Sequence, residues 1–362
     1  MSLLRRVAAL VGITSVVALL CACGTSASVK PSAARPATAL TGARCAANRA
    51  AGTIKFISPF EYDASAGILD VYAAQQLGYF KQLCLNVTFD PHISFASVYP
   101  LVSSGAATIT GEGSAADDLL EVASGMDLTA ISTFGDASDY ALLTRSSITK
   151  LSQLEGKTLG YHTQLPVVLT EMMQKAGVDV AKVHEVNDTG YDPTVLIKGH
   201  YDALQAYQSN EPLTLDAEGY SKDFREWTPA ELGVKGTFNV QVVNSNFLKA
   251  HRASVSDFLR AELHAFDYCA THGATCVGFL AQAAPKPYSP TQALKEWQIE
   301  TALAKDHTLP GMGVGVQSIA EWTPELQAVV SHKLVQHAPS LSSAMDPSLA
   351  ASLYRGKQLI WP

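Results

Sequence analysis

Short apolar runs alternate with segments of helical periodicity along most of this chain, and that alternation is the strongest constraint on its fold. The apolar runs are short enough to be strands, and most of the helical segments end at a glycine, the usual residue of a left-handed helix stop. Repeated strand–helix–strand units predict parallel sheets joined by right-handed crossovers. We therefore expect an α/β fold with mainly parallel sheets.

The alternation forms two blocks, followed by a more helical region. In the first block we expect strands at Thr53–Ser58, Leu85–Phe89, Ala107–Thr110 and Leu128–Thr133, and helices at Gly67–Leu77, Ser97–Ser103 and Ser114–Ser124. In the second we expect strands at Lys157–Tyr161, Lys182–Val186 and Tyr201–Ala206, and helices at Pro166–Ala176 and Pro193–Lys198. A strand at Asn239–Val243 then precedes helices at Ser254–Cys269, Pro290–Lys305 and Thr323–His337, which we expect to pack on the first block.

Length and charge exclude several classes of protein. The chain has 362 residues, of which 47% are hydrophobic and 16% charged, so disorder, collagen and coiled coil are excluded and two domains or one large domain are expected. The net charge of -7 and the lack of a basic patch give no attraction for phosphate backbones, so nucleic acid is not an expected partner.

The N-terminal segment predicts export and a lipid anchor. Arg5 and Arg6 precede the apolar run 7–20, which has the length of a signal peptide core and is short for a membrane span. The residues that end it, Leu-Cys-Ala-Cys, resemble a bacterial lipobox in which Cys23 is acylated; an ordinary secretory signal with a chance cysteine is the alternative. We expect a signal peptide at 1–22, a flexible tether at 23–44 rich in Ser, Ala, Pro and Thr, and a location at the outer face of the bacterial cytoplasmic membrane.

Four further cysteines fit an oxidising compartment. Cys45 and Cys84 each precede one of the first two expected strands, so parallel pairing of these strands would bring them together in a disulfide. Cys269 and Cys276 flank a short loop, Ala270–Thr275, which a second disulfide could close. A zinc site that uses nearby histidines is the alternative to the second disulfide, but the spacing is not the tight Cys-x-x-Cys of structural zinc sites.

Five segments, in order, resemble a family of periplasmic binding proteins. They are Gly78-Tyr79-Phe80-Lys81, Leu101-Val102-Ser103-Ser104-Gly105, Ala123-Ser124-Gly125-Met126-Asp127-Leu128, the run Leu151–Gly160, and Lys198–Ala203 followed by Glu211-Pro212. Together, over Thr53–Phe247, they resemble the proteins that deliver thiamine-pyrimidine precursors, alkane sulfonates, taurine or nitrate to ABC importers. Taken singly, these segments are also ordinary helix stops and turns.

The resemblance implies an architecture and a way of working. It implies a two-lobe periplasmic-binding-protein (type II) fold with parallel-rich sheets and crossover hinge strands, near Ser132–Leu143 and Phe238–Val243. Residues 45–137 and 240–362 would form the first lobe, and residues 138–239 the second. We expect a monomer without cofactor or metal, which closes on a small molecule and is read by a membrane permease.

Ligands of open parallel sheets bind beyond the carboxyl ends of the strands, and this rule selects the candidate site. The residues selected there are Phe60, Glu61, Tyr62, Phe95, Glu112, Ser114, Phe134, Tyr161, His162, Gln164, Asp188, Tyr207 and Glu211. The residues at these strand ends are rich in aromatic rings and carboxylates and include no Arg or Lys. We therefore expect a neutral or cationic heteroaromatic ligand, such as an aminopyrimidine, thiamine or a flavin.

Individual members of this set have alternative roles. Glu61 and Glu112 are the best candidates to accept ligand N–H groups, but solvated carboxylates at helix starts are equally common. His162 is either a ligand donor or an incidental loop histidine, and each aromatic ring could belong to a lobe core instead. A sulfonate, taurine or nitrate ligand is the alternative within the family.

Two functions from other classes stay open. The eukaryotic pyrimidine-precursor synthase has a similar fold, but its cysteine-rich motif is not found here, nor are Gly-x-Ser-x-Gly, a Walker loop or His-Glu-x-x-His. We therefore do not expect an enzyme. A surface contact lipoprotein without a small ligand is the third possibility.

Overall fold

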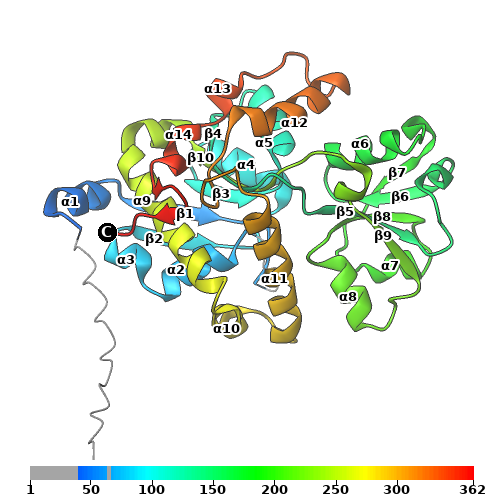
Figure 1. Ribbon diagram of the computed structural model, residues 1–362, viewed down its shortest axis with the longest axis horizontal. Helices are drawn as coiled ribbons and strands as arrows, with labels where there is room; N and C mark the ends of the chain where they lie inside the picture. Colours follow the sequence, from blue (N-terminus) through cyan, green and yellow to red (C-terminus); the bar gives the residue numbers. More distant parts are fainter. Residues whose placement is uncertain (1–39, 63–66) are drawn as a thin grey trace, which may run out of the picture. The chain divides into compact units, whose positions relative to one another are not determined.

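The computed structural model describes residues 40–62 and 67–362 (Figure 1). The signal peptide, Cys23 and the tether up to residue 39 lie outside the described residues. Within the described part, no helix is both long and apolar enough to cross a membrane.

One five-stranded sheet carries the first block of the sequence, which we call lobe 1. Its strand order is β2 (Asn86–Asp90), β1 (Thr53–Ile57), β3 (Ile109–Glu112), β10 (Phe238–Asn244) and β4 (Leu128–Gly135). β1 runs parallel to β2 and β3, whereas β10 is antiparallel to β3 and β4. The expected parallel winding is therefore confirmed for the first three strands, and the returning strand β10 makes the sheet mixed.

A second five-stranded sheet forms lobe 2. Its order is β7 (His184–Asn187), β6 (Thr158–Tyr161), β8 (Ala203–Tyr207), β5 (Tyr140–Arg145) and β9 (Phe224–Trp227). β6 is parallel to β7 and β8, and β5 is antiparallel to β8 and β9. The chain crosses between the sheets twice, at residues 136–139 after β4 and at residues 228–237 before β10.

The helices of lobe 2 cover both faces of its sheet (Figure 1). Val168 and Leu169 of α6 (Val167–Lys175) pack with Leu142 and Leu159 on one face. α7 (Thr194–Ile197) and α8 (Glu211–Ala217) pack on the other face through Leu196 and Leu215, which contact Leu143 and Leu204. The alternation of Leu142 and Leu143 between faces is the two-residue period of a strand buried on both sides.

Lobe 1 is larger because the remaining α-helices join it. They are α1 (Gly42–Ala50), α2 (Leu69–Gln76), α3 (Tyr79–Gln82), α4 (Phe95–Ser103), α5 (Ala115–Ala123), α9 (Ser245–Cys269), α10 (Gly273–Ala283), α11 (Pro290–Asp306), α12 (Ile319–Ser331), α13 (Leu341–Ala344) and α14 (Pro347–Ala351). The chain ends in a small hairpin, β11 (Tyr354–Arg355) and β12 (Gln358–Leu359). Phe258 of α9 stacks on Phe56 of β1 and on Phe80 of α3 in the larger core of this lobe.

The C-terminal helices pack on lobe 1 as expected and also reach lobe 2. α11 contacts β4 and α8, and α12 contacts α5 and α6. Gln292 Nε2 of α11 donates to Thr214 Oγ1 of α8 at 2.9 Å. Beyond the end of α12, His332 Nε2 lies 2.6 Å from Glu171 Oε1 of α6. These helices therefore link the two lobes in addition to the crossover segments.

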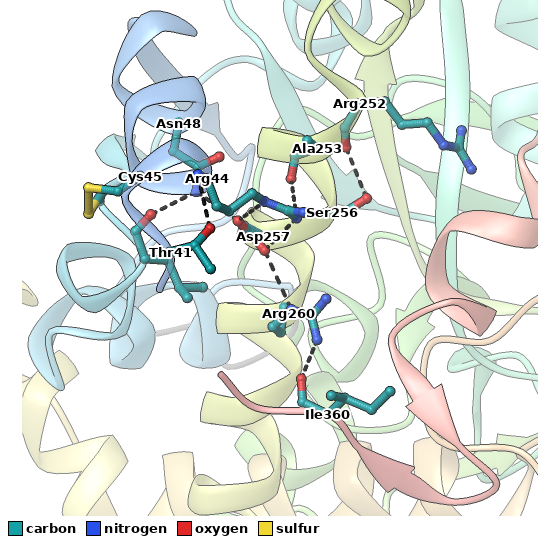
Figure 2. Close-up of polar contacts among 12 residues, drawn as sticks. Thr41, Arg44, Cys45, Asn48, Arg252, Ala253, Ser256, Asp257, Arg260 and Ile360 are labelled. Carbon is teal, nitrogen blue, oxygen red and sulfur yellow. Dashed lines mark hydrogen bonds and ion pairs between the residues drawn. A yellow bond between two sulfur atoms is a disulfide. The ribbon is translucent and has the colours of Figure 1, made fainter. Parts of the chain in front are cut away.

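Helix α1 is fastened to α9, as Figure 2 shows. Arg44 donates twice to the Asp257 carboxylate, at 2.7 and 2.8 Å, and Asn48 donates to the same carboxylate at 2.7 Å. Asp257 is buried, with 1% of its surface exposed. Residues 42–44 are thus helical, and the tether expected at 23–44 ends earlier because the Thr41 hydroxyl caps this helix.

Both expected cysteine pairs are joined as disulfides, Cys45 to Cys84 and Cys269 to Cys276. Cys45 lies within α1 instead of directly before a strand. The loop between the second pair is shorter than expected, because α10 begins at Gly273. Both bonds belong to lobe 1.

Candidate functional site

A small cavity lies where residues of both lobes meet. Its volume is about 10 Å³, roughly the space of one water molecule. It is lined by Phe60, Gly67, Gly113, Asp139, Tyr140, Tyr207, Thr237, Phe238 and Asn239. None of these lining residues is Arg, Lys or His.

Four aromatic residues, Phe60, Tyr140, Tyr207 and Phe238, line the cavity. Tyr140 and Tyr207 of lobe 2 stack with ring centroids 4.9 Å apart. Phe60 of lobe 1 meets the Tyr207 ring edge-on at 6.0 Å, and Phe95 meets Phe60 edge-on at 5.7 Å. Such rings offer flat faces and edges to another aromatic ring.

The polar residues of the cavity come from the two crossovers and the start of β10. Asp139 belongs to the first crossover, Thr237 to the second, and Asn239 to β10. Asn239 adopts a φ of 47°, a left-handed conformation that asparagine tolerates better than most residues. Its side chain is 6% exposed and its Oδ1 has no hydrogen-bond partner. A buried acceptor of this kind is suited to an N–H group of a ligand.

Asp139 is the carboxyl group that faces the cavity. Its oxygens accept hydrogen bonds from the Ser209 backbone N–H at 3.2 Å and the Ser209 hydroxyl at 2.6 Å. Burial raises its pKa to about 8; the Ser209 hydrogen bonds oppose the rise, and Glu211 and Glu226 add to it. Glu211, whose Oε2 accepts the Tyr207 N–H at 2.7 Å, has its own pKa raised to about 7 by burial.

The N-terminus of α5 points its N–H groups at side chains of the protein itself. The backbone N–H groups of residues 114–117 donate, in order, to Asp117 Oδ2, Thr237 Oγ1, Glu325 Oε2 and Ser114 Oγ. Thr237 also donates its hydroxyl to Glu325 Oε1 at 2.7 Å, and Tyr140 donates its hydroxyl to Asp117 at 3.2 Å. A helix start that could bind an anion is therefore already occupied by carboxylates and hydroxyl groups of the protein.

Five of the site residues selected from sequence lie at or beside the cavity. Phe60 and Tyr207 line it, and Phe95 packs on Phe60. Ser114 caps α5 next to Gly113, and Glu211 holds the Tyr207 backbone. The strand-end rule thus identified part of this region.

Six others lie at the ends of strands but do not line the cavity. Glu61 is exposed and pairs with His92 at 3.0 Å, and the Tyr62 ring packs among Tyr72, Phe89 and His92. In lobe 2, His162 Nδ1 lies 2.9 Å from the Asp188 carbonyl, Gln164 is exposed, and Tyr161 ends β6. Glu61 adds to a rise in the pKa of Tyr191, whose main cause is burial, so residues of both lobes also approach each other here.

Phe134 and Glu112 differ from the other selected residues. Phe134 is 2% exposed, and its ring meets that of Phe266 at 5.5 Å within the lobe 1 core. The expectation that it forms a ligand wall is corrected, because its side chain packs toward α9. Glu112 ends β3 and pairs in register with Val240; its side chain lies outside the described part of the structure.

Sequence reasoning missed Asp139, Tyr140, Thr237 and Asn239. All four lie in or next to the crossovers at 136–139 and 228–237. The second hinge was expected at Phe238–Val243, but those residues form β10 in the sheet of lobe 1 and the crossover precedes them. A crossover between two lobes must run through the floor of the cleft, so polar residues in it were a usable signal. Within residues 40–62 and 67–362, no three His, Cys, Asp or Glu side chains gather in a way that could hold a metal ion.

A family model decides the relationship of this chain. The model described as "NMT1/THI5 like" matches residues 66–275. This chain belongs to the NMT1/THI5-like family. The resemblance expected from the five sequence segments is thereby confirmed. No curated protein sequence matches the chain.

Solved structures share the fold of this NMT1/THI5-like chain at low identity. The alkanesulfonate-binding protein SsuA from Xanthomonas axonopodis pv. citri, bound to MOPS, has a TM-score of 0.63 at 14% identity, over 81% of this chain and 98% of that one. The periplasmic aliphatic sulphonate binding protein SsuA from Escherichia coli has a TM-score of 0.62 at 12% identity, over 83% and 99%. The desulfurization enzyme DSZB has a TM-score of 0.54 at 13% identity, over 83% and 98%. The expected periplasmic-binding-protein fold is confirmed.

Proposed function

We propose that this chain is the solute-binding component of an ABC importer, and that it captures a neutral or cationic heteroaromatic molecule between its lobes. The observation that carries the proposal is the cavity itself: four aromatic residues line it together with the buried carboxyl of Asp139 and the unpaired Oδ1 of Asn239. A flat ring would stack on Tyr207 or Phe60, and its N–H groups would donate to these two acceptors.

Capture requires the lobes to separate first. The present cavity, at about 10 Å³, is far smaller than the few hundred Å³ typical of small-molecule sites. We infer that an open form admits the ligand through rotation about residues 136–139 and 228–237, and that closure returns Tyr140 and Tyr207 toward Phe60. A membrane permease would recognise and bind the closed form. The ligand is released unchanged, so no reaction step is needed.

A sulfonate ligand is the second candidate, because two of the similar structures are named as sulfonate-binding proteins. The local chemistry weighs against it. A sulfonate needs several N–H donors, and those at the start of α5 are used by Asp117, Thr237 and Glu325.

We also propose that Cys23 is acylated and tethers the protein to the outer face of the cytoplasmic membrane. The lipobox-like run before Cys23 supports this. Labelling with a radioactive fatty acid should mark the native protein and not Cys23→Ala, which should be found in the soluble fraction. Label retained by the variant would contradict the anchor without affecting the ligand proposal.

The first test of the ligand is a thermal-shift screen of the protein lacking residues 1–23, against aminopyrimidines, thiamine, flavins, taurine, alkane sulfonates and nitrate. A ligand at 100 times its dissociation constant should add about 2.7 kcal/mol to the unfolding free energy. Tyr207→Ala should lose this stabilisation, whereas Tyr220→Ala in the same lobe should keep it. Stabilisation by a sulfonate alone would replace the ligand class, and a response to nothing in the panel would contradict solute capture of these classes.

A further inference from the structure

Buried carboxyl groups continue from the cavity into lobe 1. Asp139 at the cavity is followed by Glu300 of α11, Asp70 of α2 and Glu262 of α9, each at most 3% exposed. Neighbouring members affect one another electrostatically. Asp139 and Asp70 each raise the pKa of Glu300, and Asp70 raises that of Glu262. We call these four residues the acid row.

Other acids surround the row. Glu211 and Glu226 raise the pKa of Asp139, and Glu296 raises that of Glu300. Burial is the largest cause of the raised pKa of every member of the row, and it brings the pKa of Asp70 to about 7. The groups that oppose these rises are backbone N–H groups, Ser209 and the Gln241 amide. The row thus holds protons near neutral pH because charge on it is poorly compensated.

An unpaired polar atom lies at the cavity end of the row. Asn239 Oδ1 is buried there without a hydrogen-bond partner, and deeper in lobe 1 the buried Glu262 carboxyl has the Gln241 amide beside it. The Gln241 amide rests on Gly111, where a Cβ atom would lie 2.2 Å from its Nε2. An unpaired buried acceptor is costly, so the persistence of Asn239 Oδ1 points to a partner in the cavity that this form of the protein does not supply.

We propose that the captured solute carries a positive charge, and that its entry releases one proton from the acid row through Asp139. This inference rests on the proposed solute-binding function and specifies the ligand class. A cation beside Asp139 stabilises its carboxylate, so the O–H bond of one carboxyl group breaks and the proton passes to solvent. The carboxylate then compensates the ligand charge, and the net charge of the closed cleft is unchanged.

The test uses ligands whose charge does not vary with pH. Thiamine and 1-methylnicotinamide are fixed heteroaromatic cations, nicotinamide is the matched uncharged ring, and methanesulfonate is the anion. Affinities are measured by calorimetry at pH 6, 7 and 8, at each pH in two buffers with different ionisation enthalpies. Release of one proton should raise the association constant by up to tenfold per pH unit, and the buffer dependence of the heat should report close to one proton.

Variants locate the source of the proton. Asp139→Asn and Glu300→Gln should each weaken binding of the fixed cation at least tenfold at pH 8 and flatten its pH dependence. Asp179→Asn, an exposed carboxylate of lobe 2 paired with Lys182, is the matched control and should change neither. The wild-type pH series and the charged and uncharged pair decide the matter even if a variant fails to fold.

Each outcome bears on the proposal. Tighter binding of the cations with proton release supports it. Equal binding of nicotinamide and 1-methylnicotinamide, binding of methanesulfonate alone, or cation binding that does not vary with pH overturns it and leaves solute capture standing. Absence of binding by every cation at all three pH values also overturns it, and the wider screen for uncharged and anionic ligands then tests solute capture separately.

Discussion

Lobe 1 and lobe 2 each contain a five-stranded mixed sheet, but they are stabilised by different kinds of contact. Lobe 1 contains both disulfides, the α1–α9 ion pair and the long helix α9, which is kinked at His251. Lobe 2 relies on two small apolar clusters, one on each face of its sheet. Local unfolding free energy follows such differences. Lobe 1 is therefore the more strongly reinforced of the two.

A change of pH alters the stability of both lobes at once, and we expect it to have the largest effect on the free energy of unfolding. The pKa is raised to about 8 for Asp139 in the first crossover, to about 7 for Glu211 in lobe 2, and to about 7 for Glu325 in lobe 1. The folded protein therefore binds more protons than the unfolded chain between about pH 4 and 8, so stability falls as pH rises. Each group contributes up to about 1.4 kcal/mol per pH unit. Thermal unfolding should shift to higher temperature from pH 8 to pH 5; a stability maximum near pH 8 would contradict this.

The disulfide between Cys45 and Cys84 should account for much of the difference in stability between the lobes. Its sequence separation of 39 residues corresponds to about 4 kcal/mol of chain entropy. Cys45→Ala with Cys84→Ala should therefore lower the free energy of unfolding by about that amount. The bond between Cys269 and Cys276, with a separation of 7, is the internal control and should be worth about 2.5 kcal/mol. Urea unfolding measures both, and equal losses would refute the loop-length explanation.

One ion pair in each lobe provides a further comparison of their stability. Asp257→Ala in lobe 1 removes a buried partner of Arg44 and should cost about 3 kcal/mol. Asp192→Ala in lobe 2 removes an exposed partner of Lys198 and should cost less than about 1 kcal/mol. Denaturant midpoints of the two variants provide the comparison. Similar costs would mean that the clamp on α1 is not a stabilising feature.

The smallest effect is expected at the contact between the lobes. Glu171→Gln weakens the contact with His332 and should shift the balance toward the open form by less than about 1 kcal/mol. Energy transfer between dyes placed on the two lobes should fall, whereas the unfolding temperature should hardly change. A large fall in unfolding temperature would show that the contact supports folding and not closure.

The sequence predicted the parallel parts of both sheets well, because strands such as β1 and β6 are followed by helices of clear period. It missed β5 and β9, because antiparallel edge pairing breaks the strand–helix alternation that guided the prediction. Helix α10 was missed because Gly273 and the nearby cysteines suggested a loop. Residue spacing could not distinguish Phe134, which packs into a core, from Tyr140, which lines the cavity.

The fastening of α1 to α9 has a mechanical consequence. Any pull on the chain before residue 42 enters the protein through α1, the bond from Cys45 to Cys84 and the pair of Arg44 with Asp257. These attachments transmit the force to the interior of lobe 1. Lobe 2 and both crossovers do not lie between the point of attachment and lobe 1, so the force does not pass through them. If the protein is anchored as proposed, a force from the membrane would strain neither the crossovers nor the cleft. Ligand binding would then proceed as it does for the protein in free solution.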